Sequence, residues 1–116
     1  MTERPAFIQG IFSFEGRGIE TPAPFATPVK YVVPEDRRAQ MIYFRAGNAA
    51  PEMICLASMR NGKVMRYVPV GAKSSIHVPL AVVEDLDPGS VIEVLISAPA
   101  GVKSTVVLDA GFMEIL

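Results

Sequence analysis

The sequence predicts an all-β protein, folded as a two-sheet antiparallel β-sandwich of about seven or eight strands, of the jelly-roll or a related Greek-key type. Ten prolines and nine glycines are spread along the 116 residues and divide them into short apolar runs. Runs this short suit strands, whereas helices need longer periodic stretches. The length and the lack of internal repeats predict one domain over residues 1–116. An immunoglobulin-like sandwich is the nearest alternative, but its characteristic tryptophan and cysteine pair are missing.

The first half of the chain contains three candidate strands. Residues 7–14 alternate between two faces, with Ile8 and Phe14 on one and Phe7 on the other. Residues 16–28 hold three prolines and show no period, which predicts a long loop or an extended crossing. Short strands are expected at residues 29–33 and, after a charged turn, at residues 40–46.

The sharpest local signal is the pair Asn61-Gly62, which separates two β-rich runs. Asn-Gly favours a type I′ hairpin turn, because both central residues of that turn need positive φ angles. A two-residue loop places Met59 opposite Val64 and, in unbroken register, Ala57 opposite Arg66.

The second half begins with a strand at residues 75–80. It is expected at a sheet edge because Pro79 cannot donate to a ladder. Residues 81–86 are interpreted as a helical turn, and residues 87–90 form a turn that opens a strand at residues 91–97.

A turn at residues 98–101 precedes the last strand, at residues 105–115. Its alternation directs Val106, Leu108, Ala110 and Phe112 inward, and Gly111 is a candidate β-bulge.

Charge and composition exclude several partners. Eleven Lys and Arg against twelve Asp and Glu leave a formal charge of −1, so the basic surface of a nucleic-acid or anionic-membrane binder is not expected. The first residues lack a secretory apolar region, and no apolar run is long enough to cross a bilayer. We therefore expect a cytoplasmic protein. The single cysteine, Cys55, lies in an apolar run and is interpreted as a buried free thiol.

No sequence pattern indicates catalysis, a metal or another cofactor. The only histidine, His77, falls on the solvent side of its strand and has no Cys or second His at ligand spacing. The methionines are interpreted as core filling, with Met53 and Met59 on the face of Cys55 and Ala57. No serine lies in a nucleophile motif, and no glycine-rich phosphate loop occurs.

The carboxylates Glu84, Asp85 and Asp87 lie close together in the sequence. A solvated acidic turn is the favoured interpretation. A structural calcium ion at the rim of the sandwich is the alternative, because carboxylate oxygens are the ligands that calcium prefers.

Some strands are apolar on both faces, although a strand with one solvated face needs apolar side chains only on the other. In residues 40–46, Met41 and Tyr43 lie on one face and Ile42 and Phe44 on the other. The surplus must be covered by the crossing at residues 16–28, by a second subunit, or by a ligand.

Tyrosines and arginines gather on the same strands, in a mixture that suits binding hot spots. The candidate ligand- or partner-binding residues are Tyr43, Arg45, Arg60, Arg66 and Tyr67. We therefore expect a non-catalytic binding or assembly module that self-associates or docks on a protein through an apolar sheet face. The alternative is a lectin-like carbohydrate-binding module, since such modules commonly use jelly rolls.

Overall fold

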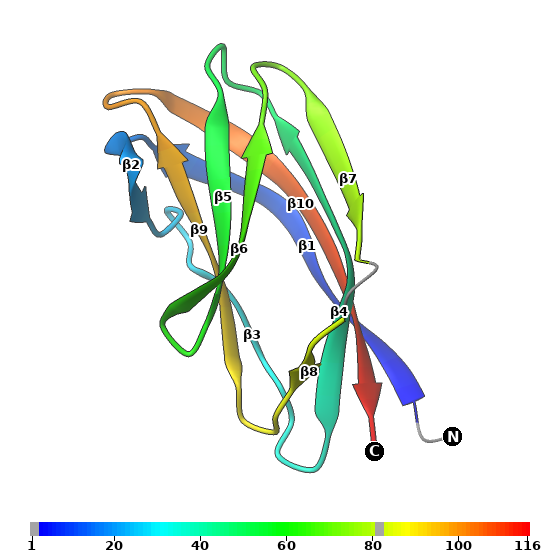
Figure 1. Ribbon diagram of the computed structural model, residues 1–116. Coiled ribbons are helices and arrows are strands. Elements are labelled where there is room, and N and C mark those ends of the chain that lie inside the picture. Colours follow the sequence, from blue (N-terminus) through cyan, green and yellow to red (C-terminus); the bar gives the residue numbers. More distant parts are fainter. Residues whose placement is uncertain (1–2, 81–82) are drawn as a thin grey trace.

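A computed structural model describes residues 3–80 and 83–116, and in this part of the chain ten β-strands form two antiparallel sheets (Figure 1). Sheet A contains β1 (Glu3–Glu15), β10 (Lys103–Ile115), β4 (Arg38–Asn48), β7 (Ser75–Pro79) and the short β8 (Asp85–Leu86). Sheet B contains β2 (Gly18–Ala23), β3 (Val29–Val32), β9 (Val91–Ala98), β5 (Ile54–Arg60) and β6 (Lys63–Val70).

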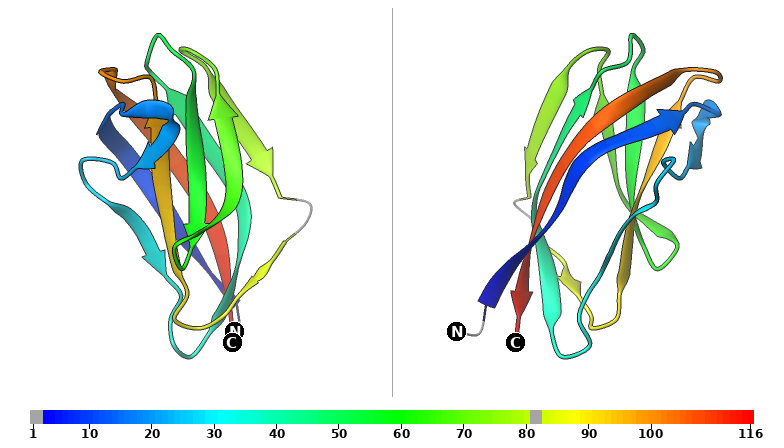
Figure 2. Two further views of the ribbon diagram at one scale, coloured as in Figure 1. Left: turned by 60° about the vertical axis from the view of Figure 1, so that its left-hand side comes forward. Right: turned by 180° about the vertical axis from the view of Figure 1, so that it is seen from behind.

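The strand order is that of a jelly roll. Sheet A runs β1-β10-β4-β7, with β8 also paired to β4, and sheet B runs β2-β9-β5-β6, with β3 also paired to β9. Most connections cross from one sheet to the other, and those that join β2 to β3, β5 to β6 and β7 to β8 stay within a sheet. The two sheets lie face to face as two layers (Figure 2). The predicted antiparallel sandwich is confirmed. The strand count is higher than expected because β2 forms inside the predicted crossing and β8 forms after β7.

The core lies between the two sheets. In β10, the alternation is confirmed, with Val106, Leu108, Ala110 and Phe112 all buried. The segment after β2 closes one end of the core by burying Phe25, whose ring packs against Phe14 in an edge-on contact. The predicted crossing therefore covers the inner side of β1 rather than an outer sheet face.

The β5–β6 hairpin has the predicted turn, because Asn61 and Gly62 have φ angles of 49° and 83°. Met59 pairs with Val64 as expected, but the register then shifts by one residue. The pairing skips Met65, so Ala57 lies opposite Tyr67, and the prediction of Arg66 at that position was wrong. A bulge that depends on the pairing of two strands leaves no signal in either strand alone.

A second bulge explains why β4 looks apolar on both faces. Gly111 pairs with Tyr43, but the next residue, Phe112, pairs with Met41, so Ile42 is the extra residue. The bulge lets Met41 and Phe44 both face the core, although strict alternation would separate them. An irregularity at Gly111 is confirmed, because the register shifts between Gly111 and Phe112, but the extra residue belongs to β4 and not to the last strand as predicted.

The connection after β7 also differs from its prediction. Residues 83–84 have no regular structure and Asp85–Leu86 is the strand β8, so the expected helical turn is wrong for residues 83–86. Residues 81–82 lie outside the described part of the chain. The predicted turns at residues 87–90 and 98–101 are confirmed, each with a glycine at positive φ.

Candidate functional site

The outer face of sheet A carries its solvent-exposed side chains in register across four strands. One row joins Ile11, Val107, Gly47 and Ser75 of β1, β10, β4 and β7. The next row joins Gln9, Asp109, Arg45 and His77. The third row joins Phe7, Gly111, Tyr43 and Pro79. We refer to the surface that these three rows form as the sheet A face.

Asp109 is the centre of a hydrogen-bonded cluster on this face. Its Oδ1 accepts hydrogen bonds from the Tyr43 hydroxyl at 2.8 Å and from the Gln9 amide at 3.2 Å. Its Oδ2 accepts from the Arg45 guanidinium at 2.6 Å, in an ion pair. Arg45 also lies 5.1 Å from the centre of the Tyr43 ring, within cation–π range. The exposed His77 ring lies nearly perpendicular to the Tyr43 ring, with the ring centres 6.1 Å apart.

The cluster fixes the protonation of its members. The hydrogen bond from Tyr43 is the main cause that holds the pKa of Asp109 below its usual range, and Gln9 and Arg45 act in the same direction. Burial and the hydrogen bond to Asp109 raise the pKa of Tyr43. At neutral pH the face therefore presents an ionised carboxylate, a neutral phenol and a guanidinium in fixed positions, which is an arrangement suited to recognition.

Apolar side chains lie next to this polar cluster. Ile11 is 71% exposed, and Phe7 and Val107 are each 51% exposed, although aliphatic and aromatic groups favour burial. Gly47 has no side chain, and beside it an open depression of about 560 Å³ lies between Val107 and β7. The sheet A face thus combines exposed apolar groups, an ordered polar cluster and a hollow.

Tyr43 depends on Gly111, which it covers. A Cβ atom at Gly111 would lie 2.1 Å from Cε2 of Tyr43, so Gly111→Ala forces the ring away and breaks its hydrogen bond to Asp109. We expect the pKa of Asp109 to rise toward the ordinary value of about 3.9. NMR titration of the Asp109 carboxyl group measures this change.

Gly47→Ala is the matched control for this substitution, because a Cβ there meets only the Cβ of Val107 at an ordinary 3.7 Å. It should leave the titration of Asp109 as in the wild type. An unchanged Asp109 titration in Gly111→Ala would contradict the assigned role of the Tyr43 hydrogen bond.

The five predicted binding residues do not form one site. Tyr43 and Arg45 belong to the sheet A face, whereas Arg60, Arg66 and Tyr67 lie on β5 and β6 of sheet B. Arg60 pairs with Asp87 at 3.4 Å, and Arg66 lies 3.8 Å from Glu84. Tyr67 is 65% exposed on the edge strand β6.

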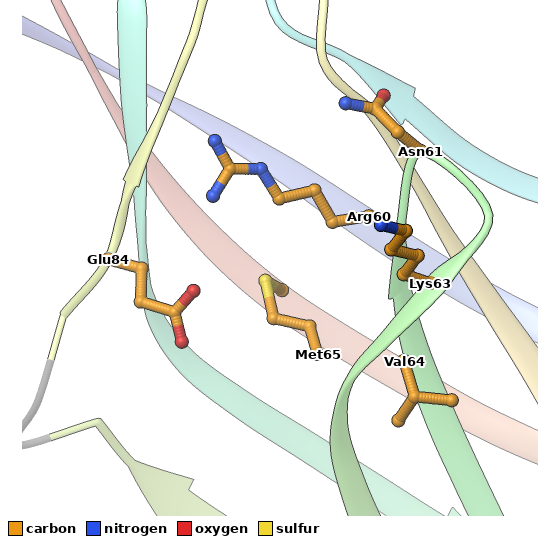
Figure 3. Close-up of a pocket in the computed structure, with 6 residues that line it drawn as sticks. All are labelled: Arg60, Asn61, Lys63, Val64, Met65 and Glu84. Atoms are coloured by element: carbon orange, nitrogen blue, oxygen red, sulfur yellow. The ribbon is translucent and has the colours of Figure 1, made fainter.

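A second depression, of about 400 Å³, lies between the β5–β6 hairpin and Glu84 (Figure 3). Its lining residues are Arg60, Asn61, Lys63, Val64, Met65 and Glu84. Structural contacts already engage much of this lining, since Arg60 and Glu84 form ion pairs and the Asn61 side chain accepts a hydrogen bond from Val91. We therefore place the candidate site on the sheet A face.

The acidic residues after β7 point to different partners. Glu84, Asp85 and Asp87 pair with three separate arginines, Arg66, Arg38 and Arg60. Within residues 3–80 and 83–116, no three His, Cys, Asp or Glu side chains converge as a metal ion requires. The same residues contain no helix long and apolar enough to cross a bilayer.

Met53, just before β5, and Cys55, on β5, are more exposed than predicted. Ile54, Leu56 and Ser58 face the core, whereas Met53 is half exposed, so the core assignment of Met53 was wrong. Cys55 is partly buried, and burial raises the pKa of its thiol, which keeps the group protonated at neutral pH.

Two members of the central cluster, Gln9 and Asp109, were missed from the sequence. Asp109 is separated from Tyr43 by 66 residues and from Gln9 by 100, so only the sheet pairing brings them together. A usable signal existed, because Asp109 is the one charged residue in the apolar run from Val106 to Phe112.

No protein-family model and no curated protein matches the sequence. Among solved structures, a CBM36-1 domain of a multidomain xylanase from the hindgut metagenome of Trinervitermes trinervoides has a TM-score of 0.58 at 12% identity. That match covers 95% of this chain and 96% of the other. A family 35 carbohydrate-binding module from Clostridium thermocellum has a TM-score of 0.53 at 12% identity, covering 94% and 97%.

Pili that form Bacillus endospore appendages give a TM-score of 0.54 at 11% identity, covering 98% of this chain and 88% of the other. At these identities the likeness shows a shared fold. The chain is therefore a β-sandwich of the jelly-roll class.

Proposed function

We propose that this protein is a non-catalytic binding or assembly module that docks on a protein partner, or on a second copy of itself, through the sheet A face. The observation that carries the proposal is the exposure of Ile11 and Val107 beside the ordered Tyr43–Asp109–Arg45 cluster. Exposed apolar groups next to fixed Tyr and Arg side chains are typical of interface hot spots. The fold likeness to carbohydrate-binding modules and to pili supports a binding or structural role rather than catalysis.

Self-association provides the direct test. Val107→Lys places a charge at the middle of the apolar part of the face, where burial against another surface would be costly. Light scattering behind size exclusion, run over a wide concentration range, measures the mass of each assembly. The assembly of this variant should have about half the mass of the wild-type assembly.

The matched control is Val32→Lys. Val32 is 55% exposed, close to the 51% of Val107, but it lies on β3 in sheet B. Its mass should follow the wild type. A wild-type protein that stays monomeric at high micromolar concentration, or equal masses for the two variants, would count against self-association through the sheet A face.

Carbohydrate binding is the second candidate, and one observation favours it. The exposed Phe7 ring lies on the same face as the amide of Gln9 and the carboxylate of Asp109. Sugar recognition by proteins uses such a pairing of an apolar surface with planar polar groups. A glycan array should give binding that Phe7→Ala removes, and an array without signal above background ends this candidate.

A further inference from the structure

The outer edge of β1 is open along part of its length. Strand β1 lies at the end of sheet A and pairs with β10 from Glu3 to Glu15 without a register shift. Among the described residues, no other strand pairs with β1. An unpaired edge presents backbone donors and acceptors that another strand can use.

One hydrogen bond fixes which residues point outward. The carbonyl of Ser13 accepts a hydrogen bond from the backbone N–H of Ala26 at 2.9 Å, so the Ser13 backbone points away from β10. In an antiparallel pair, alternate residues direct both backbone groups to the same side. Phe7, Gln9 and Ile11 therefore direct their N–H and C=O groups to the open edge.

This open edge is bounded at both ends. Toward the N-terminus, Pro5 occupies the next outward position and has no N–H to donate. Toward the other end, Ala26 already occupies the position beside Ser13. The available stretch is thus the three outward residues Phe7, Gln9 and Ile11, with Gln9 at its centre.

The stretch is self-complementary. When two copies pair antiparallel about Gln9, each Gln9 faces its counterpart, and Phe7 of one copy faces Ile11 of the other. Every outward N–H then has a carbonyl opposite it. Pro5 of each copy then lies beside Ala26 of the other copy. Because proline has no N–H, no backbone donor is left without an acceptor at this position.

The side chains agree with this register. Phe7 and Ile11 both lie on the sheet A face and are 51% and 71% exposed in the single chain. The pairing brings each against the other across the new edge, as an aromatic and a β-branched residue that form a favourable cross-strand pair. Both residues lose exposed apolar surface.

We propose that a second copy of this chain pairs with the open edge of β1, antiparallel about Gln9, to form one continuous sheet across the dimer. This contact is separate from docking on the sheet A face. It sets two such faces side by side and thereby doubles the binding surface.

The test compares Gln9→Pro with Gln9→Ala. Both substitutions remove the side-chain amide that donates to Asp109, but only proline also removes the outward backbone N–H. The ladder with β10 does not use this N–H, so the β1–β10 pairing is retained in both variants. The comparison therefore isolates the backbone contribution of the edge.

Both substitutions are made in the Val107→Lys background, so that docking on the sheet A face is absent. Light scattering and native mass spectrometry of the full chain should find a dimer for Val107→Lys and for Val107→Lys with Gln9→Ala. The variant with Gln9→Pro should be a monomer, with a dimer dissociation constant raised at least about tenfold. Retention of the dimer mass by the proline variant overturns the edge pairing, and so does a monomeric Val107→Lys protein.

Hydrogen exchange on the wild-type chain gives a second measurement that needs no substitution. The amides of Phe7, Gln9 and Ile11 should be protected at high concentration and exchange rapidly after dilution. Equal exchange at both concentrations would also overturn the pairing. A separate comparison tests self-association through the sheet A face. Equal masses of the wild type and Val107→Lys would contradict that contact and would leave the edge pairing unaffected.

Discussion

Phe112→Ala is expected to lower the free energy of unfolding by about 3–5 kcal/mol, the usual cost of truncating a buried phenylalanine. Phe112 is 2% exposed and lies on the inner face of β10, which is an interior strand of sheet A between β1 and β4. Its ring stacks on Tyr31 of β3 with centres 4.2 Å apart, so it joins the two sheets. Truncation leaves a cavity between the sheets that the neighbouring strands cannot fill. Urea denaturation measures the loss.

The control for this prediction lies on the outer side of the same strand. Val107→Ala should change the free energy of unfolding by less than about 0.5 kcal/mol, because the Val107 side chain is half exposed. A loss below about 1.5 kcal/mol for Phe112→Ala would contradict the packing described for the core.

Glu114→Ala is expected to cost about 2–3 kcal/mol, since it removes a buried carboxylate that accepts two short hydrogen bonds. Glu114 is 5% exposed and accepts from the Nε of Arg4 and from the hydroxyl of Tyr31, both at 2.6 Å. It thereby links β1, β10 and β3. The Nε and Nη1 atoms of Arg37, whose charge also acts on Glu114, are buried without a hydrogen-bond partner in the described structure. Loss of the carboxylate removes this compensating negative charge.

This contribution depends on pH. Burial acts to raise the pKa of Glu114, but the hydrogen bonds from Tyr31 and Arg4 and the charges of Arg4 and Arg37 outweigh it and hold the pKa below the usual range. The stabilisation is therefore complete above the ordinary glutamate pKa of about 4.3 and is lost as the pH falls through the lower folded value.

Urea denaturation of wild type and Glu114→Gln should accordingly show a difference at pH 7 that shrinks in acid. The exposed Glu20 supplies the control, and Glu20→Gln should match the wild type at both pH values. A wild-type advantage over Glu114→Gln that is equal at pH 7 and pH 3 would contradict the assigned ionisation.

Features that depend on neighbouring residues in the chain were predictable from the sequence. The Asn61-Gly62 turn follows from the φ angles that its two residues tolerate. The inward set of β10 follows from alternation alone, because the strand is regular along its whole pairing with β1.

Features that depend on pairing between distant strands were not predictable in this way. The extra residues Ile42 and Met65 are defined only by the strand opposite each of them. For the same reason the sequence located Tyr43 and Arg45 but not Asp109, the residue that holds both in place. The arginines and the tyrosine of β5 and β6 resemble Tyr43 and Arg45 in type, but they lie on the other sheet.

An NMR dilution series tests directly whether the chain self-associates through the proposed sheet A face. Backbone amide spectra of the labelled wild-type chain are compared between high and low micromolar concentration. We expect shift changes at Gly47 and Val107, which lie on β4 and β10 away from the open edge of β1, and none around Val32 on sheet B. Spectra that do not change with concentration, or changes confined to sheet B, would contradict it.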